Sequence, residues 1–98
     1  MFIELKKFGT TLTSRDDGHE AYSAMQPVFK NISVDEGVEI DFRGVNTFTP
    51  SWGDEFITPL FNEFGDRLIL RHLENPSVKM TLNTIEEANK INLNKETI

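Results

Sequence analysis

Three short segments with strand-like patterning are each followed by a longer segment with helical spacing, and this order constrains the fold more than any other feature. The strand segments are expected at residues 1–8, 38–42 and 67–73, where apolar and polar residues alternate or a short apolar run occurs. A short pairing segment is expected at residues 10–12. The alternation favours an α/β fold with parallel central strands and right-handed crossovers. We expect a mixed sheet of about four strands, with two or three helices packed against it.

Each helical segment begins with a residue that favours the start of a helix. Ser14 is expected to cap the first helix, and Ser51 the second. The second helix should end at Gly65, a residue type that commonly follows the last turn. Asn75, followed by Pro76, is expected to begin the third helix.

The composition is that of one folded domain with an acidic surface. Leu, Ile, Val and Phe make up about 30% of the chain, above the roughly 20% below which a charged chain stays disordered. The net charge of −6 opposes binding to nucleic acids and to anionic membranes. A chain of 98 residues has room for one domain, which we assign to residues 1–90. The Asn-rich residues 91–98 are expected to form a flexible polar tail.

Several functional classes are excluded by what the sequence lacks. It contains no cysteine, which excludes a disulfide scaffold, a thiolate zinc site and a cysteine nucleophile. The apolar runs are too short to span a bilayer, and the first residues lack a signal-peptide pattern, so we expect a cytoplasmic protein. His19 and His72 have no metal-ligand spacing, and residues 16–19 are interpreted as a solvated helix start rather than a weak metal site. We therefore expect no metal and no cofactor.

The segment from residue 41 to residue 56 carries the most information about function. It joins the end of the second strand to the second helix, and ligands of open α/β sheets bind where strands end and helices begin. We call this edge of the sheet the carboxyl rim. The residues expected on its partner-facing part are Asp41, Asn46, Trp52, Asp54, Glu55 and Asn75.

Three of these rim residues also have a purely structural interpretation. Acids such as Asp54 and Glu55 in a first helical turn complement the helix dipole. Glu55 can also pair with Arg15 at the start of the neighbouring helix, through two hydrogen bonds if the geometry allows. Trp52 either packs into the core with Phe56, four residues on, or stands out as a binding anchor. We favour the ion pair and the core position.

The same segment resembles the STAS domain, the fold of anti-sigma-factor antagonists and of the cytosolic end of sulfate transporters. In that family the strand and an Asp are followed by a loop, by Asp-Ser-Ser-Gly and by a helix, and the second serine is the phosphoacceptor. Residues 49–52 occupy the place of this motif, so that Ser51 falls on the phosphorylatable serine. Thr49, Pro50 and Trp52 replace the Asp, the first Ser and the Gly of the motif.

The sequence is more similar to an uncharacterised STAS-like group, through four motifs in the same order. These are Ser14-Arg15, Asp41-Phe42-Arg43-Gly44-Val45, Ser51-Trp52-Gly53-Asp54-Glu55 and Asn75. They lie between residues 10 and 80. The resemblance implies a STAS-like regulatory module without enzymatic activity, acting in signalling through protein–protein interaction. The implied partner is a histidine-kinase-like ATPase or a sensor.

Ser51 is the candidate phosphoacceptor, and Thr49 and Thr47 are weaker candidates on the same loop. A phosphate adds about −1.5 to −2 charges at a helix N-terminus, where free N–H groups favour anions. The fold should tolerate that charge, whereas a partner docked on the rim should not. Ser51 is alternatively only an N-cap. In a second alternative function, the same helix N-terminus binds a small anionic ligand or a nucleotide.

An enzyme and a self-associating scaffold are the remaining classes. Ser51 lacks the Gly-x-Ser-x-Gly context of a nucleophile in a serine hydrolase. No Gly-rich phosphate-binding loop with a Lys occurs, and a domain of this size has little room for a deep pocket. We therefore expect no catalytic residues. Self-association through the first strand or the tail is opposed only mildly by the net charge.

Overall fold

Within residues 1–96, four strands form one sheet, with three helices on one side of it. The strands are β1 (Phe2–Glu4), β3 (Val38–Asp41), β5 (Leu68–Arg71) and β6 (Asn94–Glu96), in the order β1-β3-β5-β6. The structure is a computed structural model that describes residues 1–96. The predicted α/β class is confirmed. The three pairings within this sheet are all parallel, whereas we expected a mixed sheet.

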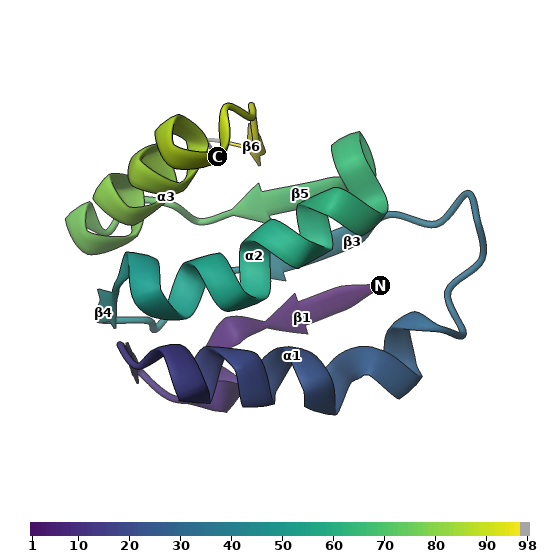
Figure 1. Cartoon of the computed structure of the whole chain (residues 1–98), viewed down its shortest axis with the longest axis horizontal. Coiled ribbons are helices and arrows are strands. Elements are labelled where there is room, and N and C mark those ends of the chain that lie inside the picture. The colour runs from purple at the N-terminus through teal and green to yellow at the C-terminus, as the bar shows by residue number, and fades with distance from the viewer. Residues whose placement is uncertain (97–98) are drawn as a thin grey trace.

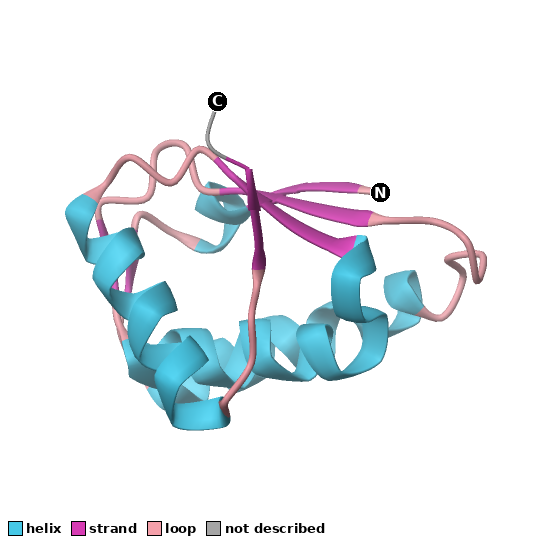
Figure 2. Ribbon diagram, turned by 90° about the horizontal axis from the view of Figure 1, so that it is seen from above, coloured by secondary structure: helices cyan, strands magenta, loops and turns pink. Residues whose placement is uncertain are grey.

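Each helix joins one strand to its neighbour in the sheet. The helices are α1 (Arg15–Phe29), α2 (Pro50–Phe64) and α3 (Pro76–Asn89), and α2 ends at Gly65 as predicted. Because the strand order follows the sequence, crossovers of one hand place all three helices on the same face. Figure 2 shows the strands as one layer and the helices as the other. No helix within residues 1–96 is long and apolar enough to cross a membrane.

The predicted first strand is shorter than expected. It ends at Glu4, and Leu5–Phe8 form a 3-10 helix, η1. The turn carries Phe8 to the aromatic rings of Trp52 and Phe56, at centroid distances of 6.2 and 5.5 Å. The alternation of apolar and polar residues could not predict where the strand ends. Leu5 is buried in the 3-10 helix, and it would also be buried if the strand continued.

A second, two-stranded parallel sheet sets the starting points of the first two helices. Its strands are β2 (Thr11–Leu12) and β4 (Thr47–Phe48). The predicted pairing segment at residues 10–12 is thereby identified as β2. Each strand lies just before a helix, so their pairing brings the first turns of α1 and α2 together at the carboxyl rim (Figure 1).

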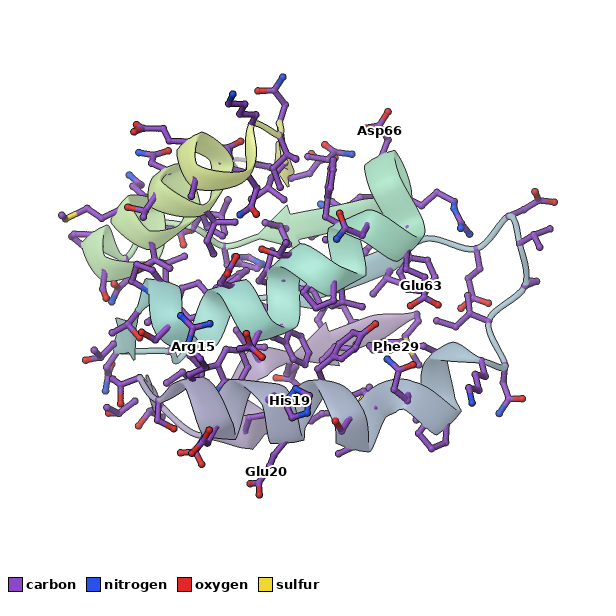
Figure 3. All side chains as sticks on the ribbon, in the orientation of Figure 1. Arg15, His19, Glu20, Phe29, Glu63 and Asp66 are labelled. Atoms are coloured by element: carbon purple, nitrogen blue, oxygen red, sulfur yellow. The ribbon has the colours of Figure 1, made fainter. Side chains whose placement is uncertain are left out.

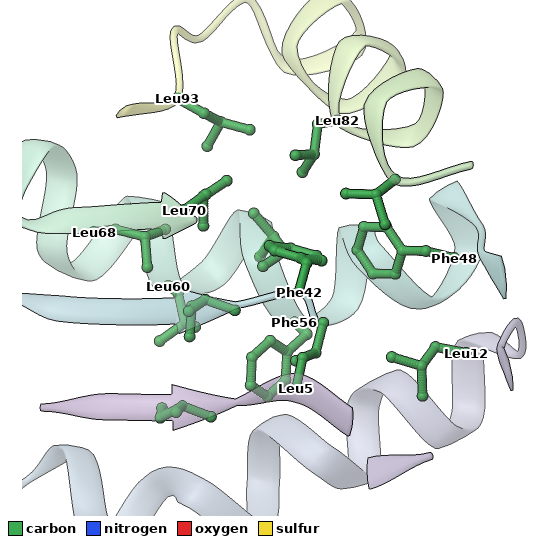
Figure 4. Close-up of a cluster of buried hydrophobic side chains, with 14 of the residues drawn as sticks. Leu5, Leu12, Phe42, Phe48, Phe56, Leu60, Leu68, Leu70, Leu82 and Leu93 are labelled. Carbon is green, nitrogen blue, oxygen red and sulfur yellow. The ribbon is translucent and has the colours of Figure 1, made fainter. Parts of the chain in front are cut away.

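The hydrophobic core fills the space between the sheet and the helices (Figure 4). Aromatic rings form a continuous row within it: the ring centroids of Phe42 and Phe48 are 5.2 Å apart, those of Phe48 and Trp52 6.0 Å, and those of Trp52 and Phe56 5.1 Å. Tilted and edge-on rings at these distances attract one another. The row runs from the end of β3 into α2 and fixes the loop between them.

Two glycines allow the helices to approach closely near the carboxyl rim. A Cβ on Gly18 of α1 would lie 2.5 Å from the carbonyl oxygen of Trp52, and a Cβ on Gly53 of α2 would lie 2.8 Å from side-chain atoms of Phe48 and Ile85. No larger residue fits at these positions without displacing a neighbour. The start of α2 therefore packs closely against the start of α1 and against Phe48 and the C-terminal half of α3.

The segment expected to be a flexible tail is held to the sheet in its described part. Asn94–Glu96 form β6 along β5. Leu93 is buried, and its N–H donates to the Glu86 carboxylate at 2.9 Å. Backbone pairing with β5, burial of Leu93 and the ion pair between Lys95 and Glu86 attach this segment to the fold. The rest of the expected tail, residues 97–98, lies outside the described residues.

Candidate functional site

The cap of the second helix lies two residues before the position predicted for it. Thr49 is the N-cap and Pro50 is the first helical residue. Proline suits that position because its φ is fixed near the helical value and it has no N–H to satisfy. The prediction that Ser51 is the N-cap is therefore wrong. Pro50 is the signal in the sequence that could have identified the correct helix start. Ser51 lies in the first turn, where N–H groups have no partner within the helix.

The hydroxyl of Thr49 is used to hold the loop. It donates to the carbonyl oxygen of Thr13 at 2.8 Å, and the N–H of Thr49 donates to the carbonyl oxygen of Leu12 at 3.0 Å. These bonds tie the start of α2 to the segment before α1. Thr47 is half-buried in β4, and its N–H donates to the carbonyl oxygen of Thr10.

Ser51 differs from its neighbours because its hydroxyl is not committed to the fold. It makes no side-chain hydrogen bond with another residue of the described chain, unlike the hydroxyls of Thr49 and Ser77. It is half-buried and lines a pocket of about 140 Å³. The other lining residues come from α1, α2 and α3 and are Arg15, Pro50, Asp54, Thr84, Ile85 and Ala88.

Beside this pocket, Arg15 and Glu55 form the predicted ion pair. The Nη1 of Arg15 donates to the Oε2 of Glu55 at 2.9 Å, through one hydrogen bond rather than two. The Nδ1 of His19 lies 3.5 Å from the other carboxylate oxygen. Figure 3 shows Arg15 and His19 on the side of α1 that faces α2. Glu55 therefore joins the two helices.

Asp54 joins α2 to α3 on the other side of the pocket. Its Oδ1 accepts hydrogen bonds from the Thr58 hydroxyl at 2.7 Å and from the Asn89 amide at 3.2 Å. The first turn of α2 contains no acidic residue, so the interpretation of Asp54 and Glu55 as first-turn acids is wrong. The earlier start of the helix moves both carboxylates into its second turn.

Two of the residues placed on the partner-facing part of the rim are buried, and for Trp52 this confirms the favoured core interpretation. The side chain of Trp52 is 1% exposed and belongs to the aromatic row, so it cannot act as a binding anchor. Asp41 is also 1% exposed, and its carboxylate accepts hydrogen bonds of 2.9 to 3.0 Å from the backbone N–H, Nε and Nη2 of Arg43. Burial raises the pKa of Asp41, but the hydrogen bonds from Arg43 outweigh it and hold the pKa below its usual value. This carboxylate fixes the turn after β3.

Asn75 is the N-cap of α3, as predicted, and also holds the loop after β3. Its Oδ1 accepts from the N–H groups of Ser77 and Val78 at 2.7 and 3.2 Å. Its Nδ2 lies 3.3 and 3.2 Å from the carbonyl oxygens of Val45 and Asn46. Asn75 is thus structural, while the side chain of Asn46 is exposed.

Ser77 and the buried Thr81 were missed in the sequence, although they hold the segment before α2. The N–H of Phe48 donates to the Ser77 hydroxyl at 2.9 Å, and that hydroxyl donates to the carbonyl oxygen of Phe48 at 3.1 Å. The Thr81 hydroxyl donates to the same carbonyl oxygen. Nothing local in the sequence indicates these contacts, since the partners lie about 30 residues apart.

The two histidines lie in separate parts of the rim. His19 is near Glu55, and the Nδ1 of His72 lies 3.9 Å from Glu74. Within residues 1–96 no three side chains of His, Asp or Glu are grouped so that they could hold a metal ion. Asn46, Ser51, Asp54 and Glu55 are four exposed or half-exposed residues of the rim. We call these four residues the open rim.

Comparison with known protein families gives one match. Residues 25–78, more than half of the chain, match a family described as STAS-like domain of unknown function (DUF4325). The matched range includes Ser51 and Asn75 and leaves out Arg15. No curated protein and no solved structure matches the chain. The resemblance to the STAS-like group is thereby confirmed.

Proposed function

The chain belongs to the family of STAS-like domains of unknown function, and we propose that it is a non-enzymatic regulatory module that binds a protein partner through the open rim. Phosphorylation of Ser51 would switch this binding off. The single observation that carries the proposal is the uncommitted hydroxyl of Ser51 at the start of α2. The neighbouring cap residues Thr49 and Asn75 are both hydrogen-bonded within the fold.

The electrostatics of the open rim favour a switch that acts through charge. Free N–H groups in the first turn of α2 stabilise an anion at Ser51, so the folded domain accepts a phosphate there. Asp54 and Glu55 already place negative charge next to the pocket. A partner that covers this surface would have to desolvate the added phosphate beside those carboxylates, which costs several kcal/mol.

The class of partner follows from the family resemblance. A histidine-kinase-like ATPase or a sensor could dock on the rim, and a kinase of this type would supply the phosphate. The chain itself has no phosphate-binding loop. We therefore assign the phosphoryl transfer to the partner and only the acceptor to this domain.

The size of the pocket favours this proposal over the binding of a nucleotide. The volume next to Ser51 is about 140 Å³, whereas sites for drug-sized ligands typically have about 300–1,000 Å³. A phosphate group fits that space, but a nucleoside attached to it does not. Isothermal titration with ATP and with inorganic phosphate tests this alternative, which predicts heat in the absence of any partner protein.

Binding to the partner is tested by comparing two charge substitutions. Ser33 is exposed in the loop between α1 and β3, at the opposite end of the molecule from the open rim (Figure 1). Immobilised wild type, Ser51→Asp and Ser33→Asp proteins are used to capture ATPases of the histidine-kinase-like class from cell extract. The affinity for the purified ATPase is then measured by titration. We expect Ser51→Asp to weaken binding at least about tenfold and Ser33→Asp to leave it unchanged. Equal affinities for Ser51→Asp and wild type would contradict the proposed phosphorylation switch. Absence of any captured ATPase would contradict the proposed class of partner.

A further inference from the structure

A second and larger hollow lies beside α1, between this helix and η1. It has a volume of about 440 Å³, within the range of about 300–1,000 Å³ typical of ligand sites. It lies between α1, η1 and β2, Trp52 of α2 also lines it, and Ser51 does not. Figure 3 shows the orientation: Glu20 points away from α2, whereas Arg15 and His19 point towards it.

The hollow is formed by the spacing of residues along α1. Asp17, Glu20, Ala21 and Ala24 line it, and this spacing places them on one face of the helix. The two alanines leave space where longer side chains would fill it. The two carboxylates stand at its edge, because both acidic side chains are exposed. The hollow is thus apolar at its base and acidic along one side.

The opposite side of the hollow is an aromatic ring held in a fixed position. Phe8 of η1 is partly exposed, and its ring packs against those of Trp52 and Phe56. The Nζ of Lys7 lies 5.5 Å from the centroid of the Phe8 ring, within the distance at which a cation is attracted to a ring face. The Phe8 ring is thus a surface on which a cation can lie, and an incoming cation would replace the Lys7 ammonium there.

The two carboxylates of the hollow are not neutralised within the described chain. Glu36, Glu39, Asp41, Glu55 and Glu86 each form an ion pair. Asp17 and Glu20 form none with residues 1–96. In a chain of net charge −6, they make the edge of this hollow a point of attraction for a positively charged group.

We propose that this hollow receives an arginine side chain from a basic segment of a protein partner. The planar guanidinium group can donate hydrogen bonds to Asp17 and Glu20 and stack on the Phe8 ring, and its aliphatic stem can cover Ala21 and Ala24. A lysine ammonium lacks the planar face needed for stacking and the fork of donors needed to reach both carboxylates. The site does not include Ser51, so an experiment that contradicts the phosphorylation switch does not contradict this site, and the reverse is also true.

Titration of the isotope-labelled protein followed by NMR tests the proposal. The probes are N-acetyl-arginine amide, its lysine counterpart, and its citrulline counterpart, which has nearly the same shape without the charge. The arginine probe should shift the amide signals of Phe8, Leu12, Asp17 and Glu20 with a millimolar Kd, and should bind more tightly than the other two. Equal binding of lysine or citrulline, or shifts centred elsewhere, would overturn the proposal. If free arginine with unblocked ends binds more tightly than the blocked arginine probe, the hollow is a small-molecule site, and the proposal of a protein partner is overturned.

Substitutions within α1 provide matched controls. Asp17→Asn combined with Glu20→Gln should weaken binding of the arginine probe about tenfold. Asp16→Asn removes a charge from the same helical turn at a residue that does not line the hollow, and should change the Kd less than twofold. Ala24→Leu fills the hollow from an exposed position and should abolish the shifts. If Asp16→Asn weakens binding as much as the double substitution, or if Ala24→Leu binds normally, the site is not the hollow.

Discussion

The helices α2 and α3 begin with the same local sequence, a capping residue followed by Pro and Ser, yet the two serines have different environments. Thr49-Pro50-Ser51 begins α2 and Asn75-Pro76-Ser77 begins α3. In α3 the cap side chain binds two N–H groups of the helix, and the serine hydroxyl binds the backbone of Phe48. In α2 the cap hydroxyl points to Thr13 instead, and the serine hydroxyl has no bond within the described chain.

The difference shows that the tertiary neighbours of a helix start decide whether its serine is structural. Ser77 faces β4, where the fully buried Phe48 has backbone groups that need partners. Ser51 faces the pocket between the helices, and its hydroxyl makes no hydrogen bond with another residue of the described chain. The fold therefore requires Ser77 and leaves Ser51 free for a modification.

The largest effect is expected at the cap of α3. Asn75→Ala removes two cap hydrogen bonds and the bonds to the carbonyl oxygens of Val45 and Asn46, and should lower the free energy of unfolding by about 2–3 kcal/mol. Urea denaturation measures the change. Asn75→Asp keeps the capping oxygen and should recover about half of the loss. A change below about 0.5 kcal/mol for the alanine variant would show that the cap is not needed.

The next largest effect is expected at Ser77. Ser77→Ala leaves the buried N–H of Phe48 without an acceptor and should destabilise the protein by about 1–2 kcal/mol in the same experiment. Ser23→Ala, at an exposed position of α1, serves as the control for loss of a serine in a helix. If the two variants are equally stable, the Ser77 hydroxyl does not stabilise the fold, and the proposed difference between the two helix starts is contradicted.

A smaller effect is expected at Thr49. Thr49→Val keeps the shape of the side chain but removes the hydrogen bond to the carbonyl oxygen of Thr13, and should cost about 0.5–1 kcal/mol. Hydrogen exchange should show faster exchange at Thr10–Ser14 and at the first turn of α2. Exchange that accelerates only in α3 would contradict the assignment of this bond to the start of α2.

The smallest effect is expected at Ser51. Ser51→Ala removes a hydroxyl without a hydrogen-bond partner in the described chain, and should change the free energy of unfolding by less than about 0.5 kcal/mol. Comparison with Ser77→Ala under identical conditions sharpens the contrast, since both serines follow a proline in the first turn of a helix. A loss above about 1 kcal/mol would mean that Ser51 supports the fold.

Patterns local in the sequence predicted much of the fold. The alternation of strand and helix segments predicted the α/β class, and the spacing of Trp52 and Phe56 predicted the core position of the tryptophan. Ser14 and Asn75 were correctly predicted as caps. Opposite charges at two helix starts were enough to predict the pair between Arg15 and Glu55. Each of these features depends on residues within one segment or on one simple pairing.

The features that were missed depend on partners far away in the sequence. Asp41 is the exception, because its hydrogen-bond partner Arg43 lies only two residues further along the chain. Ser77 binds Phe48 only because α3 packs against β4. The attachment of β6 depends on Leu93 reaching the core after α3 has ended. Periodicity carries no information on such contacts, since it describes which face of an element is apolar and not what lies opposite.

The order of the strands in the sheet has a consequence for biosynthesis. Each of β3, β5 and β6 pairs with the strand that precedes it in the sheet order and in the chain, so every new strand meets an edge already synthesised. Such an arrangement limits each closure during folding to one strand–helix unit, since the paired residues Phe2 and Glu39, Val38 and Leu68, and Ile69 and Asn94 are separated by a single crossover helix. The sheet can thus extend on the ribosome one strand–helix unit at a time, because each strand pairs with a strand of the preceding unit.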